Sequence, residues 1–390
     1  MSSARTRPSR EGKRAGAQRE SQREPRRESS PGPRSSAPSE PRSERRRRLG
    51  RRLQSALWFT LCGLGIAALL VAILGFHETL FAEIGAVATS AAYGYGLAAR
   101  TGGRPFVAGA LGLVLGVAVF VVDSDRMRTG AAVMMAVISA VFAVMGTTPA
   151  VTFLRAAREC ALATVVAGVG SLAAIGYAPV VTVNRFQYAT LVLALVGAFL
   201  LVYRLGAGLH GLGRRGLATV CGGGLLLLVT LLYAEAIRRY GTPGLIGSLR
   251  DGVVWLREHL GGYPRPIEAL LGIPALAWGT HMRARRRQGW WVCAFGVAAT
   301  APMASTFVNP EVSIIEGVLS MIYSLVVGLA LGYVVIGADL FLTGGRPGRD
   351  RRGRGSTPGE PTKAPGRRAA RRAEEAAAVR PEPGRTRALL

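Results

Sequence analysis

Charged side chains are scarce in the middle of this 390-residue chain and abundant at its ends. Residues 53–343 hold 19 Arg and 12 Asp or Glu, whereas residues 1–52 hold 17 basic and 6 acidic side chains and residues 344–390 hold 13 and 5. Most of the net charge of +26 therefore lies in the two tails. This separation excludes a soluble basic protein that binds nucleic acid, because the apolar content and the charge occupy different stretches.

Cysteine and histidine are also scarce, with four of each. No CxxC pair occurs and the His residues are scattered singly, so the ligand spacing of a metal site is missing. The Cys residues lie in apolar runs or at their ends, which does not indicate a disulfide framework. Nucleophile elbows, phosphate-binding loops and dinucleotide fingerprints are missing too. We therefore expect no metal, no cofactor and no catalytic residue, and the sequence favours a protein that is not an enzyme.

The two tails differ from the rest of the chain in composition. Residues 1–52 and 344–390 are rich in Arg, Pro, Ser, Gly and Glu and poor in large apolar side chains, so they cannot bury enough surface to offset the entropy of ordering. We expect both to be disordered and to bind anionic lipid headgroups or a membrane or cytosolic protein. Lys occurs only at Lys13 and Lys363, which is typical of a GC-rich bacterial genome.

Between the tails, apolar runs recur that are each long enough to cross a hydrocarbon core of roughly 30 Å as a helix. They predict an all-α, polytopic membrane helix bundle in residues 53–343, with about ten transmembrane helices. The predicted spans are 54–76, 80–99, 105–122, 129–146, 160–181, 186–203, 216–234, 266–282, 289–307 and 315–338.

The Arg residues of the connections predict the orientation of these helices. With the N-terminus inside, the inner connections carry eleven Arg and two acids, Glu159 and Asp339, whereas eight Arg and ten acids lie on the outer side. Arg is retained on the cytosolic side of a membrane, so both termini are predicted to be cytoplasmic, in the plasma membrane of a bacterium. The inner Arg residues are Arg100, Arg104, Arg155, Arg158, Arg204, Arg214, Arg215, Arg283, Arg285, Arg286 and Arg287.

Small residues at four-residue spacing predict the faces through which these helices pack. One such face repeats in the last helix and another in the third, and their members are Ser320, Ser324, Gly328 and Gly332, and Ala108, Gly112 and Gly116. Residues 248–260 predict an amphipathic helix on the outer surface, with Ser248 and Asp251 resembling a capping box and Gly261 ending it.

Carboxylates near the outer ends of the predicted helices are the candidate functional groups. Glu83, Glu268 and Glu316 are expected at one outer level, where they form either a shallow cation-attracting cluster or solvated helix ends. Arg185 and Arg265 are the candidate counter-ions of that cluster.

Three functions follow from these features. A permease or exporter for an uncharged, amphiphilic or lipid-like solute is favoured, because the helix centres carry no ionisable side chain. The alternative is a non-catalytic membrane partner or scaffold of cell-envelope assembly or division machinery, with the basic tails as docking arms. The third is an envelope glycolipid enzyme in which Asp123 and Asp125 hold a metal and a glycosyl phosphate.

Overall fold

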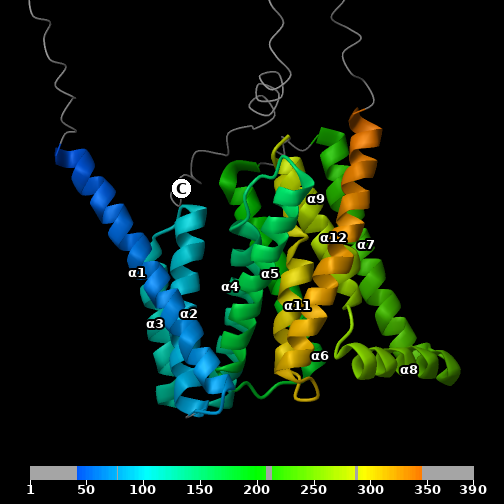
Figure 1. Cartoon of the computed structure of the whole chain (residues 1–390), viewed down its shortest axis with the longest axis horizontal. Coiled ribbons are helices and arrows are strands. Elements are labelled where there is room, and N and C mark those ends of the chain that lie inside the picture. The colour runs from blue at the N-terminus through cyan, green and yellow to red at the C-terminus, as the bar shows by residue number, and fades with distance from the viewer. Residues whose placement is uncertain (1–41, 77, 208–212, 286–288, 345–390) are drawn as a thin grey trace, which may run out of the picture. The chain divides into compact units, whose positions relative to one another are not determined.

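The computed structural model describes residues 42–76, 78–207, 213–285 and 289–344 (Figure 1). The predicted tails therefore lie outside the described residues, apart from positions 42–52 and 344. The chain divides into two compact units, Met1–Arg51 and Arg52–Leu390. Only the start of one helix is described in the first unit, so the fold described below is that of the second.

Every regular element in the described residues is helical, which agrees with the predicted all-α class. The elements are α1 (Arg42–Ile73), α2 (Glu78–Thr101), α3 (Pro105–Val122), α4 (Asp125–Met145), α5 (Phe153–Ile175), α6 (Val183–Val202), η1 (Tyr203–Ala207), α7 (Gly213–Tyr240), α8 (Pro243–Leu260), η3 (Ile267–Gly272), α9 (Ile273–Arg283), α10 (Gly289–Ala294), α11 (Val297–Val308) and α12 (Ile314–Gly344). Of these, η1 and η3 are π-helical.

Each of the ten predicted spans coincides with one helix or with a consecutive pair. Among the described residues, eight helical segments are long and apolar enough to cross a membrane. Two predicted spans, α2 and the pair η3–α9, are not among these eight segments, and the pair η3–α9 combines a π-helix with an α-helix. Ten crossings therefore remain a prediction. Helix α1 begins at Arg42, inside the segment that the composition assigned to the tail.

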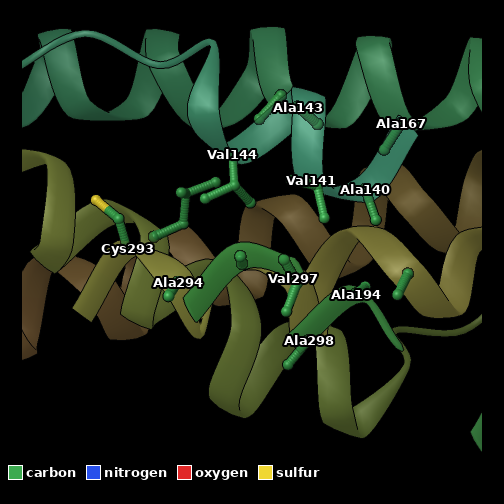
Figure 2. Close-up of a cluster of buried hydrophobic side chains, with 14 of the residues drawn as sticks. Ala140, Val141, Ala143, Val144, Ala167, Ala194, Cys293, Ala294, Val297 and Ala298 are labelled. Atoms are coloured by element: carbon green, nitrogen blue, oxygen red, sulfur yellow. The ribbon is translucent and has the colours of Figure 1, made fainter. Parts of the chain in front are cut away.

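The centre of the bundle is the segment formed by α10 and α11. Nearly all of Gly289–Val308 is buried (94%), whereas only 6% of the apolar part of α7 is. Small side chains let the surrounding helices approach it closely, as Figure 2 shows for Ala294, Val297 and Ala298 against Val141 and Ala194. Because lipid is as apolar as these side chains, close packing and dispersion contacts hold the segment there.

The pair η3–α9 packs antiparallel against this central segment. Gly272 lies against Ala299, and Gly279 lies against Cys293, where an added Cβ would come within 2.7 Å of Sγ. In both segments the regular α geometry is interrupted, although the backbone stays helical. The first changes from π to α geometry at Ile273, and the second tightens to hydrogen bonds between residues three apart at Phe295 and Gly296. We call these two segments, which lie side by side in the core, the interrupted helices.

The predicted small-residue faces lie at close helix contacts. A Cβ added at Gly328 of α12 would come within 2.6 Å of the Ile273 Cβ, and one at Gly332 would come within 3.0 Å of the Ala277 Cβ. A Cβ added at Gly112 of α3 would come within 2.9 Å of the carbonyl oxygen of Ser90 in α2. Close backbone approach at these positions requires residues without large side chains.

Helix α8 runs across the direction of the long helices at one end of the bundle (Figure 1). It begins at Pro243, with Thr242 at the N-cap, so the capping box predicted at Ser248 is wrong. The Ser248 hydroxyl instead donates to the carbonyl oxygen of Gly244 inside the helix. The predicted stop is confirmed, because Gly261 adopts the left-handed conformation (φ 70°) and its N–H donates to Arg257.

Candidate functional site

We call the end of the bundle that carries Glu268 and Glu316 the outer end, and the end that carries Thr147 the inner end, after their predicted sides. The side chain of Glu268 is fully buried at the outer end. It is the second residue of η3, and neither carboxylate oxygen has a hydrogen-bond partner among the described residues. The Arg265 guanidinium acts on it electrostatically, and the Ser324 hydroxyl is a nearby donor whose geometry falls short of a hydrogen bond. Short π-helical segments are frequent at functional sites.

A chain of charged and aromatic side chains connects this buried carboxylate with the surface. The Glu316 carboxylate lies 2.7 Å from Nε of Arg257 in α8. The Arg257 guanidinium lies over the ring of Tyr263, 5.5 Å from its centroid, and the Arg265 guanidinium lies 5.8 Å from the same centroid. We call Glu268, Arg265, Tyr263, Arg257 and Glu316 the outer cluster.

The predicted small-residue face of α12 also supports the outer cluster. Ser320 accepts a hydrogen bond from the backbone N–H of Tyr263 at 3.3 Å, and Ser324 accepts one from that of Arg265 at 2.8 Å. These two hydroxyls hold the non-helical connection between α8 and η3. The sequence suggested packing alone for these positions, and the structure adds this polar role.

The other predicted members of the acidic cluster lie elsewhere. Glu83 of α2 is 3.7 Å from Arg128 of α4, and Arg128 also binds Asp123 at 2.7 Å. Arg185 is exposed at the start of α6 and forms no ion pair with Glu268 or Glu316 in the described residues. The structure thus brings Glu268, Glu316 and Arg265 together, and it adds Arg257 and Tyr263, which the sequence did not single out.

A second polar cluster occupies the inner end, and sequence reasoning missed it. Arg100 of α2 donates from Nε to the Met145 carbonyl at 3.0 Å and from Nη2 to the Thr147 carbonyl at 3.2 Å. Arg283 of α9 donates from Nη1 to the same Thr147 carbonyl at 2.9 Å. Both Arg side chains are buried. The signal was the inner position of both Arg residues, which had been assigned to orientation only.

Further contacts fix the segment that this inner cluster holds. The buried Glu159 carboxylate accepts the N–H of Thr148 at 2.8 Å, and the N–H of Ala150 donates to the Thr280 carbonyl at 3.0 Å. The Arg283 guanidinium lies 3.5 Å from the ring centroid of Trp290 in α10. Both interrupted helices therefore contribute to the inner cluster, which consists of Arg100, Thr147, Glu159, Arg283 and Trp290.

Two cavities lie between helices of the first half of the bundle. One of about 280 Å³ is lined by α1, α2 and α3, including Trp58, Tyr95 and Phe106. A neighbouring one of about 300 Å³ lies between α2, α3 and α4, along Gly94 and Leu111. Their walls are almost entirely apolar, so they fit hydrocarbon better than a hydrated solute.

In the part of the chain that the structure describes, no group of three or more His, Cys, Asp or Glu side chains is arranged to hold a metal ion. The Asp123 carboxylate, a candidate ligand from the sequence, is instead paired with Arg128.

No protein-family model, no curated protein and no solved structure matches this chain. The class of protein is defined by the fold alone. Several long apolar helices with charged side chains gathered at their ends make this a multi-pass helical membrane protein.

Proposed function

We propose that this protein is a permease or exporter for an uncharged, amphiphilic or lipid-like solute in the plasma membrane of a bacterium, with both termini cytoplasmic. One observation carries the proposal: the two interrupted helices, η3–α9 and α10–α11, pack against each other at the centre of the bundle. Local departures from α geometry inside membrane helices are frequent at functional sites, and they are points at which a helix can change its arrangement.

The polar clusters support a transport cycle. Each cluster includes a residue at one end of η3–α9. The outer cluster includes Arg265, in the connection before η3, and the inner cluster includes Arg283, the last residue of α9. If the two clusters opened alternately, each closing its own end of the bundle while the other was open, the two central helices could move between two arrangements.

The apolar cavities support an amphiphilic solute. Each lies between helices and has almost entirely apolar walls, which suit an acyl chain. Trp58 fixes one wall, because its indole N–H donates to the Ala92 carbonyl at 2.8 Å and so ties α1 to α2. We call the cavity between α1, α2 and α3 the lateral groove.

Translocation of a fluorescent short-chain phospholipid in proteoliposomes tests the proposal. We expect the wild-type chain to move the probe between leaflets faster than protein-free vesicles do. Ala110→Trp fills the lateral groove and is expected to reduce the rate at least about tenfold. The control is Val121→Trp, which should leave the rate unchanged because Val121 is on the same helix, outside the groove and 78% exposed. Equal rates with and without protein would contradict the proposal.

Helix α7 favours a second candidate, a non-catalytic partner or scaffold of cell-envelope assembly or division machinery. Most of its apolar length is exposed, and a Cβ added at Gly222 or Gly224 would meet no atom within 4 Å. A partner helix could pack there, with the basic tails bound to anionic lipids. Loss of co-purifying membrane proteins on Gly224→Leu, with unchanged lipid translocation, would support it. We propose no enzymatic reaction.

A further inference from the structure

Glu268 is the most deeply buried carboxylate described in this protein, and few charged groups face it. From its own connection, Arg265 acts on it, and from α12 the Ser324 hydroxyl does. Helix α11, which packs against η3, contains no ionisable side chain between Val297 and Val308. On α9, His281 and Arg283 are at the far end of the helix.

The remaining ionisable groups of α12 have other surroundings. Glu316 binds Arg257 at 2.7 Å, and the Tyr323 hydroxyl donates to the Leu260 carbonyl at 2.9 Å. Asp339 lies in the last turns of α12, towards the inner end. Arg265 is therefore the one charged side chain in the described residues that offsets the charge of Glu268, and its guanidinium lies over the Tyr263 ring.

An ionised carboxylate in this position is costly, because it is removed from water and the Ser324 hydroxyl, the nearby donor, forms no hydrogen bond of good geometry to it. One Arg that makes no hydrogen bond to it offsets that cost only in part. A metal cation would need several converging oxygen ligands, and the large cavities described above are lined by other residues. A proton neutralises the carboxylate without any added volume.

We propose that Glu268 carries an exchangeable proton and that its binding and release couple solute export to proton entry. This inference rests on the proposed transport function. A proton arriving from the outer end forms an O–H bond on one oxygen of the Glu268 carboxylate. When the interrupted helices rearrange, that bond breaks and the proton leaves at the inner end, so that one positive charge enters for each solute molecule exported.

The outer cluster lies between Glu268 and the surface. Glu316 is partly accessible, with 14% of its side chain exposed, and Arg257, Tyr263 and Arg265 lie between it and Glu268. Because Arg side chains do not release protons, the proton must reach Glu268 through water. The connection that carries Tyr263 and Arg265 is tied to α12 by two side-chain hydrogen bonds. Its movement would open Glu268 to water from that side.

Infrared spectroscopy of the full chain in lipid nanodiscs tests the protonation directly. In wild type we expect a carboxylic acid C=O band that disappears as the pH is raised and that shifts in D₂O. Glu268→Gln should remove this band, whereas the matched variant Glu316→Gln should retain it. If the band that wild type loses at high pH is still present in Glu268→Gln, the assignment is overturned.

Proteoliposomes test the coupling. A gradient of one pH unit supports up to about tenfold accumulation of the short-chain phospholipid probe on one side if one proton is exchanged per molecule. We expect wild type to show gradient-driven accumulation that an ionophore abolishes, and Glu268→Gln to move the probe without accumulating it.

The outcomes separate the two proposals. Wild-type translocation that is indifferent to the proton gradient would refute coupling and leave the permease proposal standing. No translocation by wild type under any gradient would refute both. The ionophore comparison uses wild type alone, so it decides the coupling even where Glu268→Gln does not fold.

Discussion

Arg283 binds Thr147 twice, because its Nη1 donates to both the carbonyl oxygen and the hydroxyl oxygen at 2.9 Å. The two residues are 136 positions apart: Arg283 is the last residue of α9, and Thr147 lies in the connection between α4 and α5. Arg100, in the last turn of α2, reaches the same carbonyl. The inner cluster therefore ties the ends of three helices together at one end of the bundle, as expected from the predicted topology.

Loss of the Arg283 guanidinium should destabilise the inner end. Arg283→Gln leaves the buried Thr147 hydroxyl short of a donor, and it also removes the stacking on Trp290. A buried hydrogen bond to a charged group contributes about 1.5 to 3 kcal/mol, so we expect a clearly lower midpoint of thermal unfolding in detergent. The exposed inner residue Arg158 provides the control, and Arg158→Gln should have no comparable effect. Equal midpoints for the two variants would show that the cluster contributes little.

The contact between the two interrupted helices should tolerate no added side chain. At Gly272 a methyl group would overlap the backbone of Ala299, which cannot rotate away as a flexible side chain can. Overpacking costs about 1 to 3 kcal/mol or more, so Gly272→Ala should lower the yield of folded protein and its unfolding midpoint. Gly222→Ala, which meets open space, is the matched control. Both are measured by size-exclusion chromatography and thermal unfolding, and a fully stable Gly272→Ala would contradict the packing described.

The ion pair between Arg257 and Glu316 should hold the end of α8 against α12. These side chains are partly exposed, at 36% and 14%, so their coupling is expected to be modest, about 0.2 to 1 kcal/mol. In Arg257→Ala or Glu316→Ala we expect faster hydrogen exchange in the last turn of α8 and unchanged exchange in α11. The exposed Asp251 provides the control, since Asp251→Ala should leave the exchange of that turn as it is. Identical exchange in all four proteins would exclude a tether.

The predicted orientation can be tested by labelling single cysteines in intact cells. In a background without the four native Cys, Glu311→Cys should react with a membrane-impermeant maleimide added outside. Arg158→Cys should react only after lysis, because it is predicted to lie in the cytoplasm. Both positions are exposed, so burial does not confound the comparison. The reverse pattern would invert every assignment of outer and inner ends.

Helix positions could be predicted well because each depends on a local property. An apolar run of membrane length must satisfy its own backbone hydrogen bonds, and a helix does so within the run. The small-residue faces were predictable for a similar reason, since four-residue spacing places Gly328 and Gly332 on one side of α12. The start of α8 was missed because Pro243 and Thr242 form a stronger start signal than Ser248 does.

The candidate site could be predicted only in part. Glu268, Glu316 and Arg265 were chosen for their shared level near the outer boundary, and that level is a local property of each helix. Glu83 and Arg185 shared the level but not the position around the bundle, and periodicity does not determine which helices are neighbours. The depth of Glu268 was also underestimated, because the π-helix that carries it has no clear sequence signal.

The sequence by itself determined the apolar solvent of the helices, the helical class and the location of most charges at helix ends, because hydrophobicity and charge act on each segment separately. Only the tertiary structure decided that Arg100 and Arg283 meet at Thr147 and that the two interrupted helices share the core. These contacts join residues from different segments of the chain, and Arg283 and Thr147 are 136 positions apart. They depend on the order in which the helices pack, and in a bilayer that order follows from the fit of surfaces rather than from hydrophobicity.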